Sequence, residues 1–290
     1  MAGFRSVKKY AEAWDAGRSY TSHFRKVFTT ATSAWQDCSM QTGGPPAQYY
    51  ASDPLSAATL SASRGFYHGD SKAPARKYLT HFSMVGTAFG LTGTAILCDY
   101  VLYYPFIDAD DLTTQAMDNT VTLPRYTDGE GLKVIAVALT ASTPIGGQFT
   151  FEYVNQDGAT KTSPVNQLCP FGSAVSVGTI LTAINGVSSA PVLGPFVALN
   201  SADSGIRQIN SVTFSSTNAG LMALAIVKPL VTLGVREINV ENEMELVTTL
   251  TPPPEVKDGA YLNYLFWPAQ GISGATIMTG KLQFIWDEGA

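Results

Sequence analysis

The sequence predicts a mainly β protein, an antiparallel β-sandwich or jelly-roll-like body preceded by a short helical N-terminal arm. Three observations favour this fold class. Apolar, β-branched and aromatic residues recur in short runs, turn residues separate the runs, and no helical segments alternate with them. Strands that alternate with helices would have predicted a parallel α/β sheet instead.

The N-terminal arm, residues 1–45, is predicted from two apolar series at helical spacing. The series are Phe4, Val7, Ala11 and Trp14, then, beyond Gly17, Tyr20, Phe24, Val27, Phe28, Ala31 and Trp35. Each series predicts an amphipathic helix, and the QTGGPP run at 41–46 predicts a linker. A helix of about 16 residues is marginal alone in water, so its aromatic stripe needs a surface to pack on. Either the chain's own β domain or a neighbouring subunit supplies that surface. The second alternative makes Trp14, Phe24, Phe28 and Trp35 interface anchors.

The β-sandwich body is predicted over residues 46–290. Strand runs lie at 96–104, 133–140, 148–154, 206–214, 221–227 and 276–286. Asp157-Gly158 and Asp128-Gly129 predict tight turns, because glycine accepts the positive φ that such turns require. Prolines at 252–254 predict a stiff, extended link over 251–254 before the last strands.

The chain is poor in charge, with 14% charged and 45% hydrophobic residues, which excludes disorder by excess charge. Residues 162–202 are 41 consecutive positions without Asp, Glu, Lys, Arg or His. Charge is what normally resists edge pairing and patch association on a soluble protein. We therefore expect this surface to be covered, by the chain's own core or by a neighbouring subunit.

Nucleic acid and membrane are not favoured as partners. The first forty residues hold six basic and three acidic side chains, a net charge of +3, while the rest of the chain carries −8. The basic residues alternate with aromatic ones, which is typical of the polar face of an amphipathic arm. The apolar stretch 82–98 is shorter than the roughly 20 residues of a spanning helix and contains three glycines. Residues 1–9 lack the apolar run of a signal peptide, which predicts assembly in a cytoplasm.

No motif for a cofactor, nucleotide or zinc protease occurs, so we predict no cofactor, no metal site and no enzyme activity. Cys38, Cys98 and Cys169 lie far apart without a Cys-x-x-Cys pair, and buried reduced thiols are the preferred interpretation. His68 and Asp70 have a spacing that could orient an imidazole for general-base work if a serine approached. Without a G-x-S-x-G turn, we interpret them as a solvated turn.

The acids Asp108, Asp110 and Asp111 resemble part of a cation loop, which needs several converging carboxylate oxygens. The glycine and the closing glutamate of such a loop are missing from the sequence. A helix N-cap before residues 112–117 is the simpler hypothesis, because carboxylates at a helix start meet free N–H groups.

Several segments are similar to proteins encoded beside head and tail genes in tailed double-stranded DNA bacteriophages, and the likeness extends over nearly the whole chain. The segments are WDAGRSYTSHFRK (14–26), QYYASDPLSAATL (48–60), GFYHGD (65–70), LCDYVLYYPFIDADD (97–111), DNTVTLPRYTDGEG (118–131), NQDG (155–158), GPFVALNSADSGIRQI (194–209) and DGAYLNYLFWP (258–268). The resemblance implies a structural component of the virion, assembled in the host cytoplasm.

A capsid-surface cement or decoration protein is the role we predict, acting through contacts with copies of itself and with other capsid or tail proteins. The sequence departs from a major capsid subunit because it lacks an acidic, scaffold-like start and a long spine helix. Alternatives are a tail-associated protein, a receptor or glycan reader that uses exposed tyrosines and Trp267, and an enzyme that degrades an envelope polymer.

Overall fold

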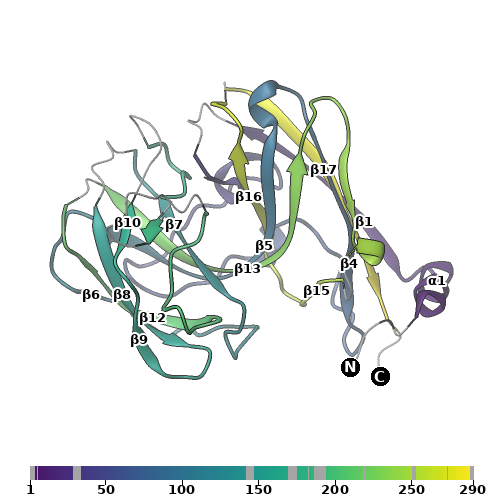
Figure 1. The fold of residues 1–290 in the computed structure, drawn as a ribbon. Helices are drawn as coiled ribbons and strands as arrows, with labels where there is room; N and C mark the ends of the chain where they lie inside the picture. The colour runs from purple at the N-terminus through teal and green to yellow at the C-terminus, as the bar shows by residue number, and fades with distance from the viewer. Residues whose placement is uncertain are drawn as a thin grey trace.

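The computed structural model is built mainly from antiparallel strands, with a short helix near the N-terminus (Figure 1). This confirms the prediction of a mainly β chain that begins with a helix. The structure describes residues 4, 6–28, 34–141, 147–168, 175–181, 183–185, 194–217, 220–249, 253–272 and 274–287.

These residues form three antiparallel sheets, and neighbouring strands within a sheet are named one after the other. The first sheet contains β14 (Asn242–Glu245), β4 (Lys77–Gly86), β17 (Thr276–Trp286), β1 (Ser19–Phe28) and β3 (Thr42–Gly44), with β15 (Glu255–Val256) also paired to β4. The central sheet contains β2 (Gln36–Asp37), β16 (Leu262–Pro268), β5 (Gly93–Asp108), β13 (Leu221–Val235) and β7 (Lys133–Ala138). The third sheet contains β11 (Ala183–Asn185), β10 (Asn166–Leu168), β8 (Gln148–Asn155), β12 (Ile206–Phe214) and β6 (Gln115–Ala116), with β9 (Thr160–Thr162) paired to β8. The helical elements are α1 (Val7–Asp15), α2 (Leu246–Thr249) and the 3-10 turns η1 (Cys38–Met40), η2 (Ala62–Arg64) and η3 (Phe89–Leu91).

The long strands β5 and β13 pair with each other and run through both halves of the molecule (Figure 1). At one end they pack on the first sheet, where Leu97 shares a buried apolar cluster with Phe82. At the other end they pack on the third sheet, where Leu224 shares a cluster with Phe151. We call these halves the terminal lobe and the middle lobe. Because both faces of β5 are covered, consecutive residues along it are apolar or aromatic instead of alternating with polar ones, with the buried Asp99 as the exception.

The two lobes meet at a waist near Pro229 of β13. The register between β13 and β5 shifts on both sides of this proline, which has no N–H to complete the ladder. Neighbouring strands also change here: β7 pairs with β13 up to Val227, and β16 begins to pair with β5 at Asp99. The predicted strand at 221–227 continues to Val235 because the irregular register accommodates the proline.

The prediction of a second helix in the N-terminal arm is wrong. Residues 19–28 form β1, which lies between β17 and β3 in the first sheet. Tyr20, Phe24 and Phe28 are four residues apart, and that spacing places side chains on one side of a strand as well as of a helix. The Thr, Phe and Val content of this segment favours the strand. As a result the first and last long strands pair with each other from Ser19 opposite Ile285 to Phe28 opposite Thr276.

The other predicted strands are confirmed, 206–214 and 276–286 with the bounds that the sequence predicts. Gly158 has a φ of +80° in the turn that joins β8 to β9, as its Asp-Gly pair predicts. Residues 82–98 contain the end of β4, η3 and the start of β5. Among the described residues, no helix combines the length and hydropathy needed to cross a bilayer. Parts of the uncharged segment (169–174, 182 and 186–193) and of the proline link (251–252) lie outside the described residues, as does Cys169.

Candidate functional sites

Asp37, the last residue of β2, is a carboxylate with no exposed surface. Its Oδ2 accepts a hydrogen bond from the Tyr50 hydroxyl at 2.5 Å, and its Oδ1 accepts one from the Tyr100 hydroxyl at 2.6 Å. The Ser39 backbone N–H is a third donor at 2.9 Å. Burial raises the pKa of Asp37, and these donors oppose the rise because they stabilise the charged form. Together they tie the segment around η1 to β5.

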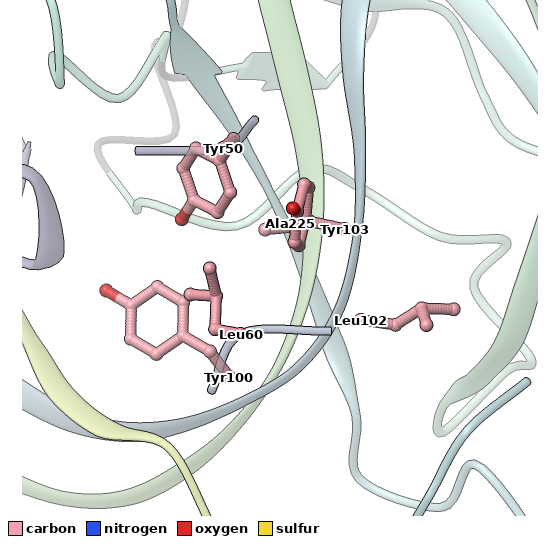
Figure 2. A pocket seen from close by; sticks show the side chains of 6 residues that line it. All are labelled: Tyr50, Leu60, Tyr100, Leu102, Tyr103 and Ala225. Carbon is pink, nitrogen blue, oxygen red and sulfur yellow. The ribbon is translucent and has the colours of Figure 1, made fainter. Parts of the chain in front are cut away.

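The surroundings of the two tyrosines show what this arrangement does. Figure 2 shows the hydroxyls of Tyr50 and Tyr100 on the same side. The other residues that line the space beside them are Leu60, Leu102, Tyr103 and Ala225. The space between these side chains is too small for a water molecule. The Asp37 carboxylate itself has no exposed surface, so it has no route to a substrate. We therefore interpret Asp37, Tyr50 and Tyr100, which we call the N-terminal clip, as structural.

A second buried carboxylate, Asp99, lies on β5 at the waist. The Arg125 guanidinium binds it in bidentate fashion, with Nε 2.6 Å from Oδ2 and Nη2 bonded to Oδ1. Arg125 also donates to the Tyr100 carbonyl at 2.7 Å, and the Tyr261 N–H donates to Asp99 Oδ1 at 3.1 Å. Burial raises the pKa of Asp99, and the arginine opposes that rise by charge and hydrogen bonding. The pair clamps the waist where β16 begins to pair with β5.

Lys26 places a buried cation in the terminal lobe. It lies on β1 with no exposed surface, and its ammonium donates to the carbonyls of Gln41 at 3.1 Å and Pro45 at 3.0 Å. Burial lowers the pKa of Lys26 to about 8, and Cys38 and Asp37 oppose this. These bonds fasten β1 to the loop around β3.

The interpretation of His68 and Asp70 as a solvated turn is wrong for His68, which is buried, and Asp70 does not orient its imidazole. His68 Nδ1 accepts from the Lys77 ammonium at 3.0 Å, so its Nε2–H donates to the Ala260 carbonyl at 3.0 Å. Asp70 accepts instead from the Tyr67 hydroxyl at 2.9 Å. Burial and then the Lys77 charge lower the pKa of His68 to about 4, so the ring is neutral at pH 7. Both nitrogens of this imidazole are engaged in holding the fold together.

The helix predicted after Asp108 is also wrong. Asp108 Oδ1 accepts from the Asp110 N–H at 2.9 Å, and Asp111 Oδ1 accepts from the Thr113 N–H at 2.8 Å. These are Asx turns, in which an aspartate caps its own loop two residues on. The chain then enters the short strand β6. The acids therefore act as local turn caps, although without the helix.

The four predicted interface anchors lie in very different environments. Phe24 and Phe28 are buried in the core of the terminal lobe, where Phe24 stacks on Phe66 with ring centroids 4.3 Å apart. Trp35 is buried and stacks on Trp267 at 5.8 Å. Trp14 alone of the four has a largely accessible side chain, at 44% exposure. Its interface role stays a prediction, whereas the other three pack inside their own chain.

Trp14 belongs to an apolar outer face of α1. The helix begins at the cap Ser6, whose hydroxyl accepts from the Lys9 N–H, and one of its faces buries Ala13 against the first sheet. Val7, Ala11 and Trp14 follow the i, i+4, i+7 rule on another face, and all three are exposed. Val7 reaches 78% exposure. This short helix therefore offers an apolar stripe to solvent after one face has been packed.

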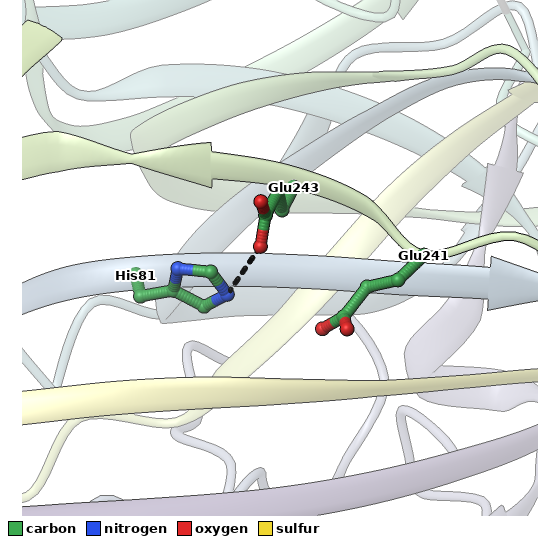
Figure 3. A group of neighbouring side chains, drawn as sticks. All are labelled: His81, Glu241 and Glu243. Atoms are coloured by element: carbon green, nitrogen blue, oxygen red, sulfur yellow. Dashed lines mark ion pairs between the residues drawn. The ribbon is translucent and has the colours of Figure 1, made fainter.

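A cluster of His81, Glu241 and Glu243 could hold a metal ion. Each offers a ligand atom that lies within 4.8 Å of those of the other two. The His81 Nε2 atom is 3.7 Å from a Glu243 carboxylate oxygen, and Figure 3 shows the imidazole facing that carboxylate with Glu241 nearby. His81 is buried while both glutamates are exposed. The cluster is therefore open to solvent on its carboxylate side.

The sequence alone did not predict the buried charges or this cluster. Asp99 had a detectable signal, because it interrupts an apolar and aromatic run with a charge, whereas Lys26 follows Arg25 in a polar stretch. Asp37 and His81 had none, since their partners come from strands and loops that are distant in the chain. Only the pairing of β4 with β14 brings His81 to the two glutamates.

Comparison with known proteins does not assign a family. No protein-family model matches the chain, and no curated protein matches it. Among solved structures, the 2.6 Å structure of infectious bursal virus derived T=1 particles matches with 10% identity over 93% of this chain and 78% of that chain. The TM-score is 0.17. A TM-score of this size marks no shared fold, and it gives this chain neither an architecture nor a role.

Proposed function

We propose that this protein is a structural component of a tailed-phage virion, a capsid-surface cement or decoration protein that acts through contacts between subunits. The observation that carries the proposal is the apolar outer face of α1. Val7, Ala11 and Trp14 would lose their contact with water on a neighbouring subunit, and burial of such side chains is the main favourable term in association. The similarity of the quoted segments to phage proteins supports the same role.

The architecture suits a static building block. Each lobe packs two sheets around one apolar cluster, and we infer that the lobes are two β-sandwiches sharing the central sheet. The N-terminal clip and the Asp99–Arg125 pair fasten the segments around Asp37 and Arg125 to β5 with buried hydrogen bonds. Rigid units of this kind lose little conformational entropy when they assemble.

The direct test is sedimentation velocity of the full chain over a range of concentrations, comparing the unchanged protein with a Val7→Lys/Trp14→Lys double variant. We expect the unchanged protein to self-associate and the double variant to do so at least about tenfold more weakly, because two charges would have to be desolvated at the contact. Tyr49→Lys is the matched control, since Tyr49 is 54% exposed beside the N-terminal clip.

Both variants should melt within a few degrees of the unchanged protein, because exposed positions contribute little to stability. Equal sedimentation of all three proteins would contradict the proposal for α1. Point substitutions are preferable to deletion of the first forty residues, because that deletion removes β1 from the middle of the first sheet.

Receptor or glycan binding on the virion is the second candidate, and an exposed aromatic pair favours it. The Tyr20 and Tyr67 rings meet edge to face at 5.2 Å, with 37% and 50% of their surface exposed. Trp267 is less suited to this role because it packs on Trp35. Glycan-array binding that disappears in Tyr20→Ala and Tyr67→Ala would favour this candidate, and a flat array would remove it.

A further inference from the structure

The outer side of the first sheet brings ionisable side chains into cross-strand register. On β14 and β4, Glu245 pairs with His81 and Glu243 pairs with Ser83. Ser83 pairs in turn with Lys281 on β17. Directly paired residues project on the same face of a sheet. An imidazole, carboxylates and one ammonium therefore meet on a single face, opposite the apolar core.

His81 is the unusual member of this group. Its side chain is 9% exposed, and its Nε2 atom is buried without a hydrogen-bond partner among the described residues. Glu243 lies 3.7 Å from Nε2 and Glu245 lies 3.8 Å from Nδ1, both beyond hydrogen-bond range. A buried ring nitrogen without a partner is costly, and an ion that binds it is one physical remedy. We propose that His81 Nε2, Glu241 and Glu243 bind one divalent transition-metal cation of the zinc type.

The distances suit such an ion after a small closure. Zinc bonds of about 2.0–2.1 Å in a tetrahedron place ligand atoms about 3.4 Å apart. The Nε2 to Glu243 distance of 3.7 Å is already near that value. The remaining separations reach at most 4.8 Å, and the exposed Glu241 and Glu243 side chains have the rotamer freedom to close them. The buried imidazole provides the fixed point of the site.

The donor set selects the class of ion. One imidazole nitrogen with two carboxylate oxygens suits zinc and similar transition metals, whereas calcium and magnesium favour oxygen ligands alone. Two carboxylates also balance the charge of a divalent cation. The negative charge of Glu245, 3.8 Å from Nδ1, favours the tautomer with its proton on Nδ1, which leaves the Nε2 lone pair for the metal. The fourth position is open to solvent.

Lys281 supplies a competitor for the same site. Its ammonium lies 2.8 Å from Glu241 Oε1, which also accepts from the Ser83 hydroxyl at 2.6 Å. Both of these contacts are to Oε1, and the positive charge of the lysine opposes the approach of a divalent cation to the same carboxylate. Removal of the lysine charge is therefore expected to strengthen metal binding, whereas loss of a ligand weakens it. If the cluster only stabilised the fold, removal of Lys281 and removal of a ligand would not change zinc affinity in opposite directions.

The test is isothermal titration of the full chain, first treated with a chelator and then titrated with ZnCl₂ in separate runs for each variant. We expect one site per chain, weakened about tenfold or more in Glu243→Gln and His81→Gln. Lys281→Met should bind about fivefold more tightly, the factor that a nearby unit charge contributes in a high-dielectric setting. Glu237→Gln is the matched control, because it removes an exposed glutamate from the loop before β14 and should leave the affinity unchanged.

Glu243 is exposed, so its variant tests the site even if His81→Gln fails to fold. Nitrogen chemical shifts of the His81 ring report independently whether zinc is bound at Nε2. Titration with MgCl₂ should show no site of comparable affinity. Zinc binding that is equal in the unchanged protein, Glu243→Gln and Lys281→Met would overturn the proposal, as would its absence from the unchanged protein. The site stands independently of the proposed role in a virion.

Discussion

The waist and the N-terminal clip each bury a whole carboxylate, but they stabilise it in different ways. At the waist, Asp99 faces the full charge of Arg125. In the clip, Asp37 accepts from neutral donors, two of which are tyrosine hydroxyls. Burial raises the pKa of both acids. Several shared neutral donors can therefore replace a directly bonded counter-charge, and the loss of one partner should be far more damaging at the waist than in the clip.

Removal of the waist arginine should have the largest effect. Arg125→Met leaves the Asp99 carboxylate buried without its counter-charge, and breaking a buried pair in this way costs about 3–5 kcal/mol. Urea unfolding at pH 7 measures this loss of free energy of unfolding. Arg236→Met, at an exposed arginine, should change stability by less than about 0.5 kcal/mol. A cost below about 1 kcal/mol for Arg125→Met would contradict the role of the clamp.

Lys26 is a buried cation that is held by neutral carbonyls, the reverse of the two buried carboxylates. Its pKa falls from the ordinary lysine value of 10.5 to about 8 in the folded chain. Between these values the unfolded chain holds more protons, so the stability contributed by neutral Lys26 is complete above 10.5 and is lost as pH falls to about 8. Relative to Lys26→Met, the free energy of unfolding should rise by about 2 kcal/mol between about pH 8 and 9.5. Parallel pH curves for the two proteins would show that the lysine titrates normally.

Loss of one hydroxyl donor of the clip should reduce the free energy of unfolding by less than loss of the waist arginine. Tyr100→Phe removes one of three donors to Asp37 and leaves a buried oxygen partly unsatisfied, a change that costs about 1–2 kcal/mol. Denaturant unfolding gives the value, and Tyr49→Phe is the control at an exposed ring. If Tyr100→Phe were as damaging as Arg125→Met, the distinction between neutral and charged compensation would fail.

The His68–Lys77 contact should give the smallest effect. Because the pKa of His68 is about 4 in the folded chain against an ordinary histidine value of 6.5, its stabilising contribution is lost as pH falls from 6.5 toward 4. The free energy of unfolding should drop by about 1 kcal/mol between about pH 6.5 and 5.5 through this group. Thermal melts at several pH values in this interval check this. The melting temperature of His68→Gln should fall less steeply with decreasing pH than that of the unchanged protein. An identical slope in both proteins would assign the pH dependence to other groups.

The strand pattern could be predicted from sequence, because β-branched runs and Asp-Gly turns are local signals. The strand β1 could not, since aromatic residues four apart satisfy both a helix and a strand. Its neighbours β17 and β3 decide between the two, and β17 lies at the other end of the chain. The course of β13 past Pro229 was also hidden, because only its pairing with β5 shows where the register shifts.

The functional groups were less predictable than the fold. A charge inside an apolar run marked Asp99 as unusual, but its partner Arg125 lies in a loop that no spacing rule connects to β5. The separation between His81 and Glu243 in the chain is bridged only by the register of β4 and β14. Likewise, Phe24 is buried because β1 turns its side chain into the core of the terminal lobe, and Trp14 is exposed because it lies on the outer face of α1. Helical spacing alone predicts neither environment.

We propose that this chain works as a virion subunit whose α1 face contacts a neighbour. Electron cryomicroscopy of purified particles that contain the full chain tests it most directly. We predict density for the protein at repeated, symmetry-related positions, with Val7 and Trp14 covered by an adjacent subunit. Absence of the chain from purified particles, or copies whose α1 face is open to solvent, would contradict the claim.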